Sequence, residues 1–153
     1  MARIVRLDIV EGKPRTFICE EALENGLFLE IVGKAENAEL GVEADYEAYA
    51  VEKANADTER GQLLFHASVE NMYDERLMKQ DFVLEAKKAG RGYQLVMGDI
   101  VTIPKVSGAV VGAKLGLGAN GELVTGGELF VVEALEDIVA HDLVQESMVI
   151  RVL

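Results

Sequence analysis

Short apolar runs, each bounded by turn residues, recur along the whole chain. Runs of about four to eight residues rich in Ile, Val and Leu are typical of β-strands. In residues 46–53, successive side chains alternate between two faces, which also favours a strand, although the alanines and glutamates of this segment suit a helix as well. The pattern predicts strands over residues 3–10, 15–19, 27–32, 46–53, 63–69, 100–103, 106–111, 113–117, 122–124, 128–134 and 148–153.

Turn residues separate these runs and indicate how the strands connect. Glu11–Pro14 is expected to turn the chain so that residues 15–19 return beside residues 3–10. Asn-Gly pairs at residues 25–26 and 120–121 are typical of hairpin turns. No long helical pattern interrupts the strands. We therefore expect a mainly all-β fold, a compact β-barrel, β-tulip or sandwich with many short strands and at most one or two short helices.

The length of 153 residues suits one domain, so we expect residues 1–153 to form a single domain. Residues 36–45 form an acidic loop or a weak edge in this interpretation, and a less regular insertion lies near residues 70–90. The single cysteine, Cys19, cannot form an internal disulfide and has acidic neighbours, so we expect a buried, unreactive thiol.

The charge balance narrows the range of partners. The chain has 15 basic and 27 acidic residues, which gives a formal net charge of −12. Nucleic acid repels such a surface in the absence of a local basic stripe, so we expect no nucleic-acid partner. The N-terminal residues do not resemble a signal peptide, and no apolar run is long enough for a membrane helix. We expect a soluble chain made in the cytoplasm, with no membrane partner.

The glycine pattern from Gly116 to Gly121 matches the dinucleotide fingerprint G-x-G-x-x-G, and Asp137 follows at a suitable distance. That chemistry needs a helix directly after the glycines, whose N-terminus faces the pyrophosphate. Here residues 122–127 read Glu-Leu-Val-Thr-Gly-Gly, which favours a strand and a further turn. We therefore interpret the glycines as a hairpin turn and expect no cofactor.

Catalytic and metal-binding patterns are also missing from the sequence. His66 and His141 lie far apart and have no cysteine or histidine nearby with ligand spacing. His66 and Ser68 would share one face of a strand, but no serine lies in a nucleophile elbow. We expect no catalytic or metal-ligating residue and no enzymatic activity. A deep pocket that held His66 with two acids would instead favour an enzyme or a ligand-binding β-barrel.

Four segments carry a resemblance to a known group of proteins: residues 21–29, 97–103, 118–124 and 130–137. An Asn-Gly step leads into an apolar strand, Met97-Gly98-Asp99 precedes another, and a glycine-rich hairpin and Val131-Val132-Glu133 follow. This order resembles auxiliary head proteins of tailed bacteriophages, the capsid decoration or cement proteins and the head-fibre base proteins. The resemblance implies a small β-barrel or β-tulip that binds the outer capsid lattice, often as a trimer.

These expectations combine into one functional hypothesis. The chain is expected to be a virion protein on the capsid surface that stabilises the shell, with the major capsid protein as partner and a homo-oligomer, a trimer, as its working form. The alternatives are another virion subunit, such as a tail-tube or capsid-like protein, and a non-viral ligand-binding β-barrel. The expected partner contacts are an N-terminal arm and a loop with exposed methionines: Met1, Ala2, Arg3, Ile4, Met72, Tyr73 and Met78.

Overall fold

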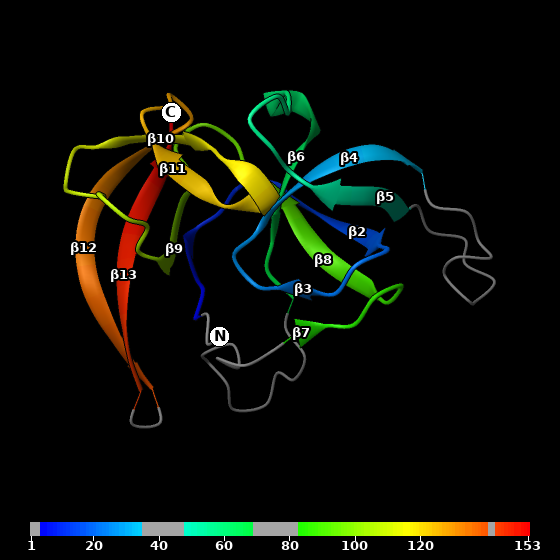
Figure 1. Cartoon of the computed structure of the whole chain (residues 1–153), viewed down its shortest axis with the longest axis horizontal. Coiled ribbons are helices and arrows are strands. Elements are labelled where there is room, and N and C mark those ends of the chain that lie inside the picture. The colour runs from blue at the N-terminus through cyan, green and yellow to red at the C-terminus, as the bar shows by residue number, and fades with distance from the viewer. Residues whose placement is uncertain (1–3, 35–47, 69–82, 141–142) are drawn as a thin grey trace.

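The computed structural model describes residues 4–34, 48–68, 83–140 and 143–153. The described chain consists mainly of β-strands, which form a closed five-stranded barrel, a six-stranded sheet and a small two-stranded sheet (Figure 1). Two 3-10 turns, η1 (Arg60–Gln62) and η2 (Ala119–Gly121), are the only helical elements in these ranges. The predicted all-β class is confirmed. No helix in the described ranges is long and apolar enough to cross a membrane.

The barrel is formed by five strands in the order β2-β5-β4-β6-β8. β2 and β5 run parallel, and the other neighbours run antiparallel. Apolar side chains of the strands, among them Phe17, Leu29 and Leu64, form one buried cluster and fill the barrel. The bounds of the strands are β2 Lys13–Cys19, β4 Phe28–Lys34, β5 Ala48–Lys53, β6 Leu63–His66 and β8 Ala89–Gln94. The short strands β3 (Leu23–Glu24) and β7 (Val83–Leu84) pair with each other.

The six-stranded sheet has the order β1-β9-β13-β12-β10-β11, and all its pairs are antiparallel. Its core face packs on the outer side of the barrel. Phe28 of the barrel lies with its ring centroid 5.1 Å from that of Phe65 and 5.1 Å from that of Phe130 in the sheet. The strands are β1 Arg6–Ile9, β9 Ile100–Pro104, β10 Lys114–Leu117, β11 Leu123–Thr125, β12 Phe130–Ala140 and β13 Leu143–Val152.

The first two strands do not form the predicted hairpin. β1 pairs with β9 in the sheet, whereas β2 pairs with β5 and β8 in the barrel. The chain therefore crosses from one layer to the other at Glu11 and Gly12. The buried carboxylate of Asp99 fixes this crossing, because it accepts backbone hydrogen bonds from Glu11 at 2.8 Å, Gly12 at 3.0 Å and Val96 at 2.9 Å.

Three other differences concern the second half of the chain. Residues 106–111 were expected to be a strand but form turns, and β8 was not predicted. Both β12 and β13 are longer than expected (Figure 1). β12 continues to Ala140, and β13 begins already at Leu143. Residues 36–45 and most of the insertion near residues 70–90 lie outside the described residues.

The turn at Asn120 and Gly121 is a hairpin, as the glycine pattern predicted. It joins β10 to β11, and both turn residues have positive φ, 56° and 77°. Gly121 also donates its N–H to the carbonyl of Ala54 at 2.8 Å, so the hairpin docks on the barrel. A Cβ at Gly121 would lie 2.6 Å from the Phe28 carbonyl oxygen, so glycine is needed for both conformation and space.

This geometry predicts different costs for two glycine substitutions. Gly121→Ala should lower the free energy of unfolding by about 2 kcal/mol or more, because it adds a backbone clash to the strain of positive φ. Gly126→Ala is the matched control: Gly126 also has positive φ, 104°, but nothing lies within 4 Å of its added Cβ. It should cost about 1 kcal/mol. Urea unfolding measures both, and equal losses would contradict the proposed close approach.

Candidate functional site

The predicted partner contacts lie mostly outside the described residues. These are Met1, Ala2, Arg3, Met72, Tyr73 and Met78. Ile4 is described, and its side chain is fully buried. Its N–H donates to Gln145 Oε1 at 2.7 Å, and its carbonyl accepts from Gln145 Nε2 at 2.9 Å. Ile4 is thus fastened to β13, and its side chain is not presented on the surface.

His66 and Ser68, which share a face as the sequence suggested, form a hydrogen bond. His66 Nε2 and Ser68 Oγ are 2.8 Å apart, and His66 Nδ1 lies 2.8 Å from the carbonyl oxygen of Glu24. A carbonyl only accepts, so Nδ1 carries the ring proton and Nε2 accepts the Ser68 hydroxyl proton. Burial lowers the pKa of His66 to about 4, which keeps the ring neutral.

The residues around His66 and Ser68 connect strands at the end of the barrel. Phe17 meets the His66 ring edge-on, with centroids 5.3 Å apart. The Asn25 side chain bonds the backbone of Ser68 in both directions, at 3.0 Å and 2.8 Å. The Ser68 hydroxyl also accepts the Arg91 N–H at 2.9 Å. The pair has the geometry of a nucleophile and its base, but here it joins β3, β6 and β8 in the interior.

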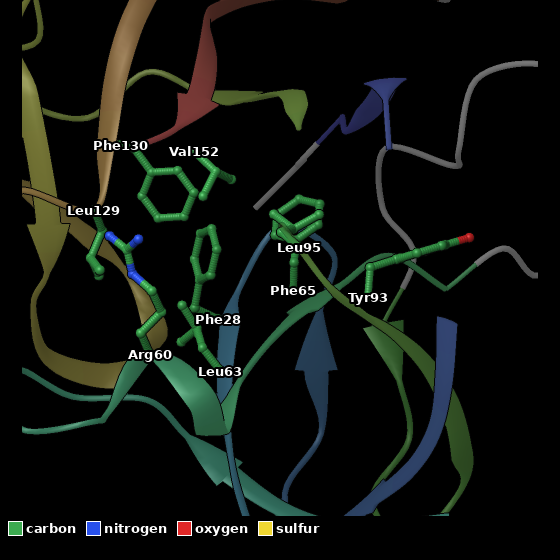
Figure 2. Close-up of a pocket in the computed structure, with 9 residues that line it drawn as sticks. All are labelled: Phe28, Arg60, Leu63, Phe65, Tyr93, Leu95, Leu129, Phe130 and Val152. Atoms are coloured by element: carbon green, nitrogen blue, oxygen red, sulfur yellow. The ribbon is translucent and has the colours of Figure 1, made fainter. Parts of the chain in front are cut away.

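A small pocket lies where the barrel meets the sheet (Figure 2). Its volume is about 20 Å³, which is close to the space of one water molecule and far below that of a cofactor site. Figure 2 shows the rings of Phe28 and Phe130 next to each other, with an angle of 53° between their planes, and the Tyr93 hydroxyl turned away from them. At the rim, Arg60 donates to the carbonyl of Leu153 at 2.6 Å. The pocket is therefore a seam between the two layers.

A wider hollow of about 400 Å³ lies at another part of the barrel, beside Cys19. Cys19 is buried as expected, and burial raises the pKa of its thiol. Neither this hollow nor the seam is lined by His66. Within the described ranges, no group of three or more His, Cys, Asp and Glu side chains is arranged to hold a metal ion.

The long hairpin of β12 and β13 carries an exposed apolar face. Val139 is 66% exposed and lies opposite Val144, which is 58% exposed, while Leu135 is 39% exposed. Side chains alternate along a strand, so Val144 shares its face with the core residue Met148. We call the set Leu135, Asp137, Val139, Val144 and Glu146 the hairpin face. It continues the core face of the sheet beyond the part that the barrel covers.

The hairpin face is exposed because β12 and β13 are longer than their neighbours. β9 pairs with β13 only from Ser147 to Arg151, and β10 pairs with β12 only at Phe130 and Val131. Figure 1 shows the distal halves of both strands extending past the rest of the sheet. On the other side of these halves Ile138 and Gln145 are buried, and Gln145 holds Ile4. One side is thus covered and the other open.

The two sides of the hairpin also differ in whether their carboxylates form ion pairs. On the covered side, Glu136 pairs with Arg6, which also bonds Asp8 at 2.6 Å and Thr102 at 3.0 Å. Glu133 likewise pairs with Arg151. On the hairpin face, Asp137 lies directly opposite Glu146, and neither forms an ion pair with any described residue. Like charges directly opposite each other destabilise a sheet.

The hairpin face is therefore an apolar strip interrupted by an uncompensated pair of carboxylates. Sequence reasoning missed it, because residues 135–140 and 143–147 were not expected to be strands. A signal was present in Val139 and Val144, which flank the short polar segment His141-Asp142. Comparisons with known protein families, with curated protein sequences and with solved structures find no match for this chain.

The buried His66 predicts a pH dependence of stability. Its folded-state pKa of about 4 lies below the ordinary value of 6.5, so the unfolded chain takes up a proton that the folded chain does not. Stability at this site is therefore present above pH 6.5 and is lost as the pH falls towards 4. Between pH 7 and pH 5 the loss should be about 2 kcal/mol.

Urea unfolding at these two pH values measures the loss, with His66→Gln as the comparison. The variant should lose about 2 kcal/mol less than the wild type over the same interval, because it has no imidazole to protonate. An identical pH dependence in both proteins would show that His66 titrates normally in the fold.

Proposed function

We propose that this chain is a viral structural protein that decorates a capsid by binding the outer face of the major capsid protein lattice. The observation that carries the proposal is the hairpin face: Leu135, Val139 and Val144 are exposed on strands that reach past the rest of their sheet. An exposed apolar strip with a polar interruption is typical of a surface that binds another protein.

The anchoring of the hairpin supports a role in binding. Gln145 holds Ile4 by two hydrogen bonds, and Arg6 and Arg151 form ion pairs with Glu136 and Glu133. These contacts fix one side of the hairpin to the body of the protein. A surface held in position before binding loses less conformational entropy on association than a loose loop does. The open side is therefore well suited to contact a lattice.

Three of the four segments that resemble auxiliary head proteins lie in or beside the six-stranded sheet that carries this surface, whereas residues 21–29 include β3 and the start of β4. Residues 97–103 contain the Asp99 turn and most of β9, and residues 118–124 contain the docked hairpin at Gly121. Residues 130–137 form the first part of β12 and include Leu135 and Asp137 of the hairpin face. The resemblance is thus concentrated in the six-stranded sheet that carries the exposed strands.

The acidic surface fits the same role. A net charge of −12 favours solubility at high concentration, which suits a protein needed at high copy number. A homotrimer is the proposed working form, since a multivalent binder gains affinity for a repeating lattice. Light scattering should therefore give three times the 16.7 kDa mass of one chain.

The proposal is tested with capsids of the phage whose genome encodes the chain. Purified protein should cosediment with these shells at a fixed ratio to the major capsid protein and should raise the temperature at which the shells open. Bovine serum albumin, another acidic protein, controls for trapping in the pellet. Shells that neither retain the chain nor gain stability would overturn the proposal.

A further inference from the structure

We infer that the free edge of β12 binds an extended segment of the partner by strand addition, and that this segment carries a basic residue between two apolar residues. The inference rests on the proposed function for its setting, because it names how the chain would hold the protein that it decorates. It adds the binding edge, the mode of binding and the chemistry of the ligand.

The backbone edge of β12 provides the first observation. Val132 exchanges hydrogen bonds with Gly112 and Ala113, each at 2.9 Å, and among the described residues these are the last backbone bonds on this side of the strand. From Glu133 to Val139, β12 pairs with β13 and with no second strand in the described part of the chain. Such an edge presents N–H and C=O groups that an incoming strand can bond.

The side chains beside this edge provide the second observation. Leu135, Asp137 and Val139 stand at every second position, so they share one face, and all three are exposed. An added strand places its own alternate side chains next to them. The complementary pattern is apolar opposite Leu135, basic opposite Asp137 and apolar opposite Val139, with one residue between each. A lysine or arginine at the centre would also lie near Glu146, across from Asp137.

The charges decide which occupant fits. A second copy of β12 paired antiparallel about Asp137 would place two copies of this carboxylate side by side, and like charges directly opposite are unfavourable. Asp137 and Glu146 already face each other without a cation among the described residues. A basic segment relieves this repulsion, whereas a second copy adds to it. We therefore assign the edge to a different, basic partner and place the trimer contacts elsewhere.

The covered side of the hairpin explains why only the hairpin face would select for particular ligand side chains. Ile138 and Gln145 are buried, and Glu136 is paired with Arg6. The ligand residues that point to that side meet groups that are already satisfied. Polar residues such as threonine suit these positions, because they favour a strand without requiring a specific contact.

Two synthetic peptides test the inference on the full chain. One has the core Val-Thr-Lys-Thr-Val and the other Val-Thr-Glu-Thr-Val, and binding is measured by fluorescence anisotropy. The lysine peptide should bind about fivefold or more tightly than the glutamate peptide, because the central charge changes from attraction to repulsion at two carboxylates. Raising the salt concentration should reduce this preference.

Three double variants locate the binding site. Asp137→Asn with Glu146→Gln should remove the preference for lysine and leave residual binding of both peptides. Val139→Ser with Val144→Ser should weaken both peptides by about fivefold or more. Val32→Ser with Val83→Ser is the matched control, because these valines are 51% and 49% exposed on β4 and β7, which are not part of the six-stranded sheet, and it should change neither affinity. Far-UV circular dichroism checks that each variant is folded.

The inference is overturned if the lysine peptide does not bind, if both peptides bind equally, or if the Val32 and Val83 control weakens binding as much as the hairpin variants. Capsid cosedimentation decides the proposed function separately. Capsid binding without the peptide preference retains the proposed function and removes the inference. The peptide preference without capsid binding retains the inferred peptide site and removes the proposed function.

Discussion

The contact of Phe28 with Phe65 and Phe130 holds the two layers of this protein together. Phe28 and Phe65 point out of the barrel, and Phe130 is the first residue of β12. The three rings lie in the larger buried cluster. Aromatic rings bury a large area and prefer defined relative orientations, so they fix both the distance and the direction of the sheet. The docked turn at Gly121 adds a backbone bond to Ala54 beside this cluster. The position of β12, and with it the hairpin face, depends on this contact.

Buried polar groups determine how the chain passes between the layers. Asp99 satisfies three backbone N–H groups where β1 gives way to β2, and Gln145 pairs with both backbone groups of Ile4. Unpaired, these groups would be costly to bury, so each side chain specifies one arrangement of the chain around it. His66 does the same at the end of the barrel, where it bonds Glu24 and Ser68. The buried polar side chains thus determine how the segments of the chain are connected.

The hairpin combines a fixed side and an open side. Arg6 and Arg151 neutralise carboxylates on the covered side, and Asp137 and Glu146 stay opposed on the open side. Exposed ion pairs contribute little to stability, but these two define which acids are compensated and which are not. The proposed capsid partner and the proposed basic strand both follow from this asymmetry. Neither depends on the pocket at Phe28, which is too small for a bound molecule beyond a water.

The sequence by itself determined the class of the fold and its local turns. Apolar runs bounded by glycine and asparagine predicted most strands, and Asn120-Gly121 predicted the hairpin, because these are properties of a few adjacent residues. Pairing between distant strands was decided only by tertiary structure: β1 meets β9 instead of β2 because Asp99 and the shared core bring distant residues together. The hairpin face was missed for the same reason. Its strands contain acids at Glu136, Asp137 and Glu146, and only the length of β12 and β13 relative to β9 and β10 leaves their apolar side exposed.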